Sequence, residues 1–132
     1  MGDVQIKRVY AQPESSDGYR VLVDRLWPRG VSKLGARLDA WLKDVAPTPE
    51  LRTWWNHDPD RMAEFATRYR LELIGNPAVV TLAREAEGRP RTTLLYGAHD
   101  PQINHAVVLL EYLKERDAVS YTHLTLPTKR IV

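Results

Sequence analysis

The sequence predicts a single three-layer α/β domain, in which a mostly parallel sheet is flanked by helices. Short apolar runs without strict alternation are typical of strands that are buried on both faces of a sheet. Helical segments also occur along the chain, and each begins with a capping side chain followed by proline. The length of 132 residues fits one domain.

Three runs predict strands because they are short, apolar and rich in β-branched residues: 6–10, 20–24 and 92–98. A fourth segment, 40–46 (AWLKDVA), fits either a strand or one helical turn, and we favour the strand. In parallel α/β sheets, ligands collect outside the carboxyl ends of the strands. The loops after 20–24 and 92–98 are therefore the first places to look for a site.

Four helix starts share one pattern. The capping side chain accepts a bond from an otherwise unpaired amide, and proline at the first helical position loses no hydrogen bond. The four pairs are Thr48-Pro49, Asp58-Pro59, Asn76-Pro77 and Asp100-Pro101. The last three open amphipathic segments with apolar residues three and four apart, and Gly88 is the expected stop after the third.

Composition excludes several classes of protein. The absence of cysteine excludes disulfides, thiolate metal sites and cysteine nucleophiles. No apolar run approaches the roughly 20 residues of a membrane span, and the N-terminus MGDVQIKRVY has no apolar signal core. We therefore expect a cytoplasmic protein without a membrane partner. The oligomeric state is left open.

The formal net charge of +2 overstates the basic character of the domain. Lysine and arginine number 19 against 17 acidic residues, and two of the cations, Lys129 and Arg130, lie in the last thirteen residues. Without them the count is 17 against 17. A nucleic-acid footprint needs cations clustered on one face, so this balance argues against a nucleic-acid partner.

Residues 119–132 differ from the rest of the chain. They contain no acidic residue, show no clear period and carry Pro127 late in the segment. They resemble translated vector or read-through sequence more than the end of a domain, although YTHLTL alternates roughly as a strand does. We therefore expect one domain over residues 1–118 and exclude 119–132 from the functional argument.

The loop after the strand 20–24 concentrates cations. Residues 24–33 read DRLWPRGVSK, where Pro28 and Gly30 prevent a regular helix. A guanidinium recognises carboxylate or phosphate with two parallel bonds. The alternative is a structural loop with solvated arginines. The residues that we expect to bind an anion are Arg25, Arg29 and Lys33.

Two other residues of this loop have alternative roles. Trp27 could stack on a base or sugar, or it could close the edge of the core. Asp24, at the strand end, could orient Arg25 or act as a base. No P-loop or GxGxxG pattern is present, so the loop is not a recognised nucleotide fingerprint.

The loop after 92–98 reads HDPQINH. Asn104 and His105 are expected in the first turn of the last helix, where the helix N-terminus attracts anions. His105 could donate to a phosphate or shuttle a proton, with Asp24 or Asp100 completing an acid–base group. The alternative is a half-buried histidine that fills the seam between sheet and helix.

The motif HDP occurs twice, at 57–59 and 99–101. Helix capping accounts for both aspartates, and whether His57 or His99 has a function is left open. No spacing matches a metal-ligand pattern, so the sequence predicts neither a metal nor a cofactor. Trp54 and Trp55 cannot share one helix face, so one of them is expected to face solvent or a cleft.

Three blocks, VLVDRLWPRGVSK, WLKDVAPTPELRTWWNHDPDRMAEFATRY and TLLYGAHDPQINHAVVL, resemble the YeaO-like branch of the bacterial family catalogued as domain of unknown function 488. The resemblance runs from Ile6 to Arg116. It implies a cytoplasmic α/β domain without a settled activity.

The wider family carries two patterns that suggest a site. One is a strand ending in Asp-Val-Arg with a proline soon after; Asp24, Arg25 and Pro28 are similar, with a spacing one residue shorter. The other is Cys-His-Arg, where this chain has Asn-His-Ala at 104–106. Any thiol chemistry of distant relatives therefore does not apply here.

The residues thus favour a domain that binds or acts on a small anionic, phosphate-bearing ligand at the strand-end loops. Two alternatives remain: a nucleic-acid-binding regulator, and a non-enzymatic protein-interaction module that uses the two adjacent tryptophans. The sequence leaves open whether the domain is an enzyme.

Overall fold

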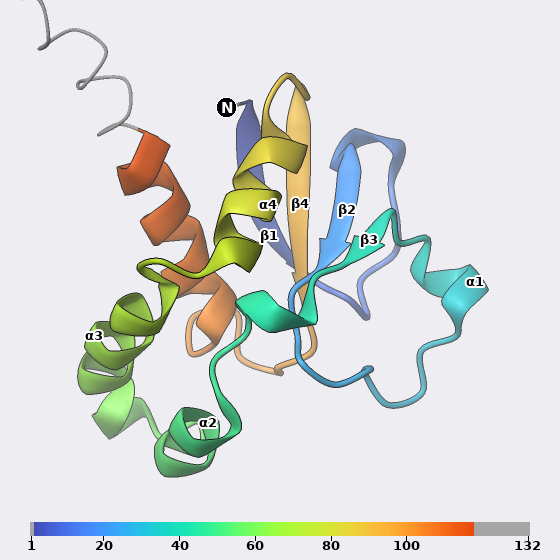
Figure 1. Cartoon of the computed structure of the whole chain (residues 1–132). Helices are drawn as coiled ribbons and strands as arrows, with labels where there is room; N and C mark the ends of the chain where they lie inside the picture. Colours follow the sequence, from blue (N-terminus) through green and yellow to red (C-terminus); the bar gives the residue numbers. More distant parts are fainter. Residues whose placement is uncertain (1, 118–132) are drawn as a thin grey trace, which may run out of the picture.

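The computed structural model describes residues 2–117, so the expected tail 119–132 lies outside the described residues. Within this part of the chain, four strands form one sheet in the order β1-β4-β2-β3 (Figure 1). The strands are β1 (Asp3–Arg8), β2 (Tyr19–Leu22), β3 (Ala40–Trp41) and β4 (Arg91–Tyr96). All three pairings are parallel, which confirms the predicted α/β class.

All four strands differ from their predicted bounds. β2 and β4 begin one residue earlier and end two residues earlier than predicted, and β1 and β3 differ by more. β1 begins at Asp3 rather than at residue 6, because the register with β4 pairs Asp3 with Arg91 and their side chains bond at 2.9 Å. Of the segment 40–46, only Ala40 and Trp41 pair with β2. The chain then turns through the 3-10 helix η2 (Lys43–Val45), which buries Val45 in the core.

Three of the predicted helix starts are confirmed. Thr48 caps α2 (Pro49–Trp55) and Asn76 caps α4 (Pro77–Ala86). Asp58 caps the 3-10 helix η3 (Pro59–Arg61), which runs directly into α3 (Met62–Leu73). As predicted, α4 ends just before Gly88, whose φ of +77° suits glycine.

The fourth start differs from the prediction. Asp100 accepts bonds from the amides of Gln102 and Ile103, but these close a turn rather than a helix. The last helix begins at residue 105 and runs through residue 117, the last one described. Asn104 is its cap and accepts a bond from the amide of Val107 at 3.0 Å.

The main core lies between one face of the sheet and the helices α2, α3, α4 and 105–117 (Figure 1). Alternate strand residues such as Val21 and Leu94 face this layer. Trp55 stacks on Phe65 with ring centroids 3.8 Å apart, and both side chains are fully buried. This stacking packs α2 against α3 in the core, next to the carboxyl end of the sheet.

The other face of the sheet is covered mainly by residues 25–39, which we call the cover segment. Leu22, Leu95 and Val9 contact its partly buried side chains Trp27, Val31 and Leu38. The cover segment contains the one-turn helix α1 (Lys33–Ala36). The three layers are therefore unequal, with most of the helical mass on one face.

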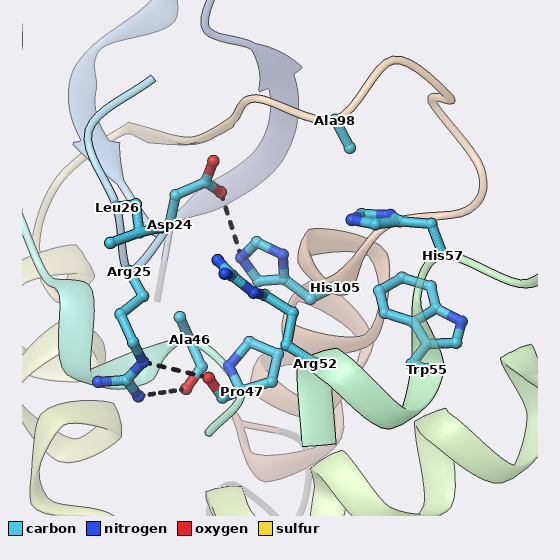
Figure 2. Close-up of a pocket in the computed structure, with 10 residues that line it drawn as sticks. All are labelled: Asp24, Arg25, Leu26, Ala46, Pro47, Arg52, Trp55, His57, Ala98 and His105. Carbon is cyan, nitrogen blue, oxygen red and sulfur yellow. Dashed lines mark hydrogen bonds and ion pairs between the residues drawn. The ribbon is translucent and has the colours of Figure 1, made fainter. Parts of the chain in front are cut away.

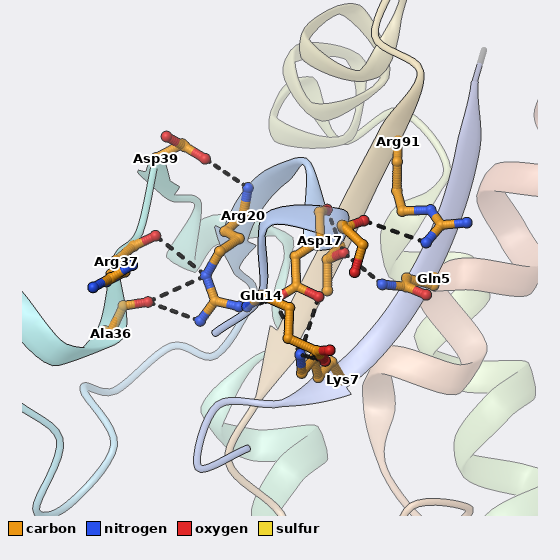
Figure 3. A network of polar contacts seen from close by, with 11 residues as sticks. Gln5, Lys7, Glu14, Asp17, Arg20, Ala36, Arg37, Asp39 and Arg91 are labelled. Atoms are coloured by element: carbon orange, nitrogen blue, oxygen red, sulfur yellow. Dashed lines mark hydrogen bonds and ion pairs between the residues drawn. The ribbon is translucent and has the colours of Figure 1, made fainter. Parts of the chain in front are cut away.

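A buried polar network completes the covered face (Figure 3). Asp17 lies in the 3-10 helix η1 (Ser15–Asp17) and pairs with both Lys7 of β1 and Arg20 of β2. Arg20 also donates to the carbonyl oxygen of Ala36 at 2.8 Å, which ties the end of α1 to the sheet. None of the helices within residues 2–117 is long and apolar enough to cross a membrane.

Candidate functional site

A cavity of about 100 Å³ opens at the carboxyl end of the sheet, between the loops that follow β2 and β4, helix α2 and the start of helix 105–117 (Figure 2). This is where parallel α/β sheets bind ligands. The lining residues are Asp24, Arg25, Leu26, Ala46, Pro47, Arg52, Trp55, His57, Ala98 and His105.

The structure brings Asp24 and His105 together. Asp24 Oδ2 accepts a bond from the Gly97 amide at 2.9 Å, and a Cβ at position 97 would lie only 2.9 Å from that oxygen. Gly97 thus allows the carboxylate to sit close to the end of β4. His105 Nε2 lies 2.9 Å from the carbonyl oxygen of Val23 and 3.4 Å from Asp24 Oδ1.

These distances assign the tautomer of His105. Both neighbours of Nε2 are oxygen acceptors, so Nε2 carries the proton and donates to Val23. In the neutral ring, Nδ1 is then an unprotonated acceptor. Figure 2 shows Nδ1 on the side of the ring that faces Ala98 and His57, and no hydrogen bond from residues 2–117 reaches it.

Burial shifts both members of this pair toward their neutral forms. Burial raises the pKa of Asp24, while the charge of His105 and the Gly97 amide oppose this shift. Burial lowers the pKa of His105, and the charge of Asp24 opposes that shift. His105 is therefore neutral near pH 7. Asp24 Oδ1 is buried and has no hydrogen-bond partner among the described residues.

Arg25 lines the cavity but its guanidinium is already engaged. It donates to the carbonyl oxygens of Ala46 and Pro47 at 3.1 and 3.2 Å, and it lies 3.7 Å from Asp44. These contacts hold the segment after η2 against the end of β2. The predicted cation is thus at the cavity, with a clear structural task.

Arg52 is the cation that the sequence argument missed. Its side chain projects from α2 and is exposed, and it makes no hydrogen bond or ion pair with any of residues 2–117. Figure 2 shows its guanidinium reaching over the cavity beside His105, and its charge acts on both Asp24 and His105. The available signal was its spacing of three residues from Trp55, which places both on one side of α2.

His57 also lines the cavity. It follows the cap residue Asn56, and both have positive φ, at +53° and +50°. Such a conformation is uncommon outside glycine, although asparagine and histidine adopt it more readily than most residues. It lays the imidazole against Trp55 at a centroid distance of 4.6 Å. His99 is exposed and lies in a neighbouring hollow with His57 and Asp100.

The remaining predicted site residues lie outside the cavity lining. Trp27 donates from Nε1 to Val31 and meets Trp41 edge to face at 5.4 Å, so it packs the cover segment. Arg29 and Lys33 are exposed on that segment. Asn104 and Asp100 are occupied in capping contacts at the start of helix 105–117.

Metal ligands do not gather in this region. Within residues 2–117, no group of three or more histidine, aspartate or glutamate side chains could hold a metal ion. The polar groups around the cavity are instead two arginines, two imidazoles and one carboxylate.

The fold and the cavity define a single α/β domain with a candidate ligand site at the carboxyl ends of parallel strands. Residues 3–124 match the family model described as "Inactive DUF488-N3 subclade", and the chain therefore belongs to this subclade of the DUF488 family. The resemblance drawn from the LWPRG and NHDP blocks is confirmed.

Curated relatives carry no assigned activity. The uncharacterized protein Rv3073c of Mycobacterium tuberculosis is 43% identical over 113 residues, which cover 86% of this chain and 95% of that protein. The uncharacterized protein YeaO of Escherichia coli is 40% identical over 112 residues, 85% of this chain and 97% of that protein. No solved structure matches the chain.

Proposed function

We propose that this domain binds a small anionic, phosphate-bearing ligand in the cavity between the strand ends and α2. The observation that supports the proposal best is Arg52, an exposed guanidinium that reaches over the cavity and has no partner within residues 2–117. A guanidinium binds phosphate or carboxylate oxygens with two parallel charge-assisted bonds.

The size of the cavity suits the head group of a ligand. A volume of about 100 Å³ has room for a small group such as a phosphate. A larger ligand would place its anionic group inside the cavity and the rest toward the mouth at His57. Trp55 and Pro47 supply apolar surface beside that group.

Binding without turnover agrees best with the family description, which calls the subclade inactive. The acid–base pair that the sequence suggested is partly used for structure, because His105 Nε2 donates to Val23 and Asp24 accepts from Gly97. These contacts orient the two side chains toward a ligand without requiring a reaction.

The adjacent tryptophans support the interaction-module hypothesis less well. Trp55 is buried, and Trp54 is half-buried with the guanidinium groups of Arg61 and Arg68 over its ring at 5.2 and 4.3 Å. The pair therefore offers little of the contiguous exposed apolar surface that a protein partner would cover.

Titration of the ¹⁵N-labelled protein with inorganic phosphate tests the proposal. Phosphate should shift the amide signals of residues around the cavity, and Arg52→Gln should weaken binding about tenfold or more, because a bond to a charged group contributes about 1.5–3 kcal/mol. Arg29→Gln is the matched control, since Arg29 is exposed but does not line the cavity. Equal weakening by both substitutions, or no binding by the unaltered protein, would overturn the proposal.

A further inference from the structure

We propose that the cavity requires a hydrogen-bond donor on the anion, so that it binds hydrogen phosphate and other hydroxyl-bearing anions but discriminates against fully deprotonated sulfate. This inference rests on the anion site proposed above and concerns its selectivity.

The tautomer of His105 gives the cavity one hydrogen-bond acceptor. Because Val23 and Asp24 present only oxygen atoms to Nε2, the ring proton is held on that nitrogen. Nδ1 therefore offers a lone pair on the side of the ring that faces Ala98 and His57 (Figure 2). A ligand hydroxyl can donate to this nitrogen, whereas a bare oxyanion would meet it lone pair against lone pair.

Asp24 also favours a ligand that carries a proton. Asp24 lines the cavity and its side chain is 20% exposed. Within residues 2–117, Oδ2 accepts from the Gly97 amide and the buried Oδ1 has no hydrogen-bond partner. A carboxylate oxygen can accept more than one bond, so Asp24 is a second acceptor beside the ligand. When ionised it repels a fully deprotonated anion, but it accepts a bond from an anion that carries a hydroxyl.

Together these groups present one free cation and two acceptors. Arg52 attracts the negative oxygens of the ligand, while His105 and Asp24 favour a side of the ligand that carries a proton. Hydrogen phosphate satisfies both requirements and sulfate satisfies only the first. Leaving a buried acceptor without a donor costs enough free energy to weaken binding about tenfold or more.

Inorganic phosphate and sodium sulfate are the probes. At about pH 8, above the second pKa of phosphate, both anions are tetrahedral dianions of similar size that differ by one hydrogen atom. We expect the ¹⁵N-labelled protein to bind phosphate at least about tenfold more tightly than sulfate. Arg52→Gln should weaken the binding of both anions by a similar factor and preserve the ratio of their affinities.

A second measurement addresses the tautomer without any substitution. Long-range ¹H–¹⁵N correlation spectra distinguish protonated from unprotonated ring nitrogens, and they should show Nε2–H with bare Nδ1 in His105 of the free protein. Phosphate should shift the Nδ1 signal, and sulfate at the same concentration should not.

The outcomes separate the two proposals. Equal affinity for phosphate and sulfate, with both lost in Arg52→Gln, would leave the anion site standing and overturn the selectivity. A proton on Nδ1 in the free protein would also overturn the selectivity. Failure of both anions to bind would overturn the anion site and the selectivity together.

Discussion

Asp24 and His105 have opposite effects on stability as the pH changes, because burial moves their pKa values in opposite directions. His105 has a lowered pKa in the folded protein, so the unfolded chain takes up its proton first as the pH falls below about 6.5. The free energy of unfolding therefore decreases as the pH falls from about 6.5 toward the folded pKa. Asp24 has a raised pKa, so its protonation at lower pH favours the folded state.

This linkage predicts a pH-dependent stability that His105 controls. Urea unfolding of the unaltered protein should show a loss of stability between about pH 7 and pH 5.5, with a slope of at most about 1.4 kcal/mol per pH unit from one histidine. His105→Gln keeps a side-chain N–H donor and should flatten this slope. His99→Gln, at an exposed position, should leave the slope as it is. An unchanged slope in His105→Gln would contradict the assignment.

We expect two residues of the cover segment, Trp27 and Arg29, to differ in their contribution to stability. Trp27 is half-buried against Leu22 and Leu95 and donates to Val31, so Trp27→Ala should lower the free energy of unfolding by about 3 kcal/mol. Arg29→Ala removes an exposed side chain and should stay within about 0.5 kcal/mol. Melting curves of the two variants decide the matter, and a large loss in Arg29→Ala would show that this arginine braces the turn.

At the scale of elements, the cover segment depends on a charged network beneath it. Burial alone would raise the pKa of Asp17, but the Glu14 amide, Lys7 and Arg20 lower it below its ordinary value. Asp17 and Arg20 are almost fully buried, and Arg20 donates to carbonyl oxygens at the end of α1 (Figure 3). The network thus couples β1, β2 and the cover segment.

Removing one member should therefore cost more than an ordinary surface ion pair. Asp17→Ala leaves two cations without their buried partner, and we expect a loss of about 3–5 kcal/mol in urea unfolding. Glu14→Gln is the control, because Glu14 contacts the same lysine from an exposed position and should change stability by less than about 1 kcal/mol. Similar losses in both variants would contradict a larger contribution of the buried carboxylate.

Features that depend only on neighbouring residues in the sequence, such as helix caps, were predicted well. Thr48 and Asn76, each followed by proline, mark helix starts because capping depends on neighbours in sequence. The same signal at Asp100 predicted a start four residues too early. Asn104 caps the helix instead, and His105 at its first position contacts the carbonyl oxygen of Val23. The predicted strand 40–46 was too long, because the length of β3 depends on its pairing with β2, which no local sequence pattern reveals.

At the scale of the whole molecule, topology made part of the site predictable. Strands β2 and β4 are parallel neighbours, so the residues after them, including Asp24 and His105, meet at one edge. Arg25 at that edge was predicted, but the second arginine there, Arg52, was not predictable in this way. Arg29 follows β2 closely in sequence, but the cover segment carries it away from the cavity, whereas the packing of α2 brings Arg52 to it.

The last prediction concerns the extent of the domain. We expect deletion of residues 119–132 to leave the fold intact, because the last helix already buries Val108, Leu109 and Leu113 within the described residues. The break in composition after Arg116 favours the same boundary. However, the family match extends to residue 124, so a second deletion of 125–132 serves as the control.

Melting curves of the full chain and the two shortened chains place the boundary. Both deletions should keep the melting temperature within about 2 °C of the full chain, since surface changes usually alter stability by less than about 0.5 kcal/mol. A loss of several degrees in the longer deletion alone would show that residues 119–124 pack against the domain. The boundary would then coincide with the end of the family match, and only the final eight residues would be foreign to the fold.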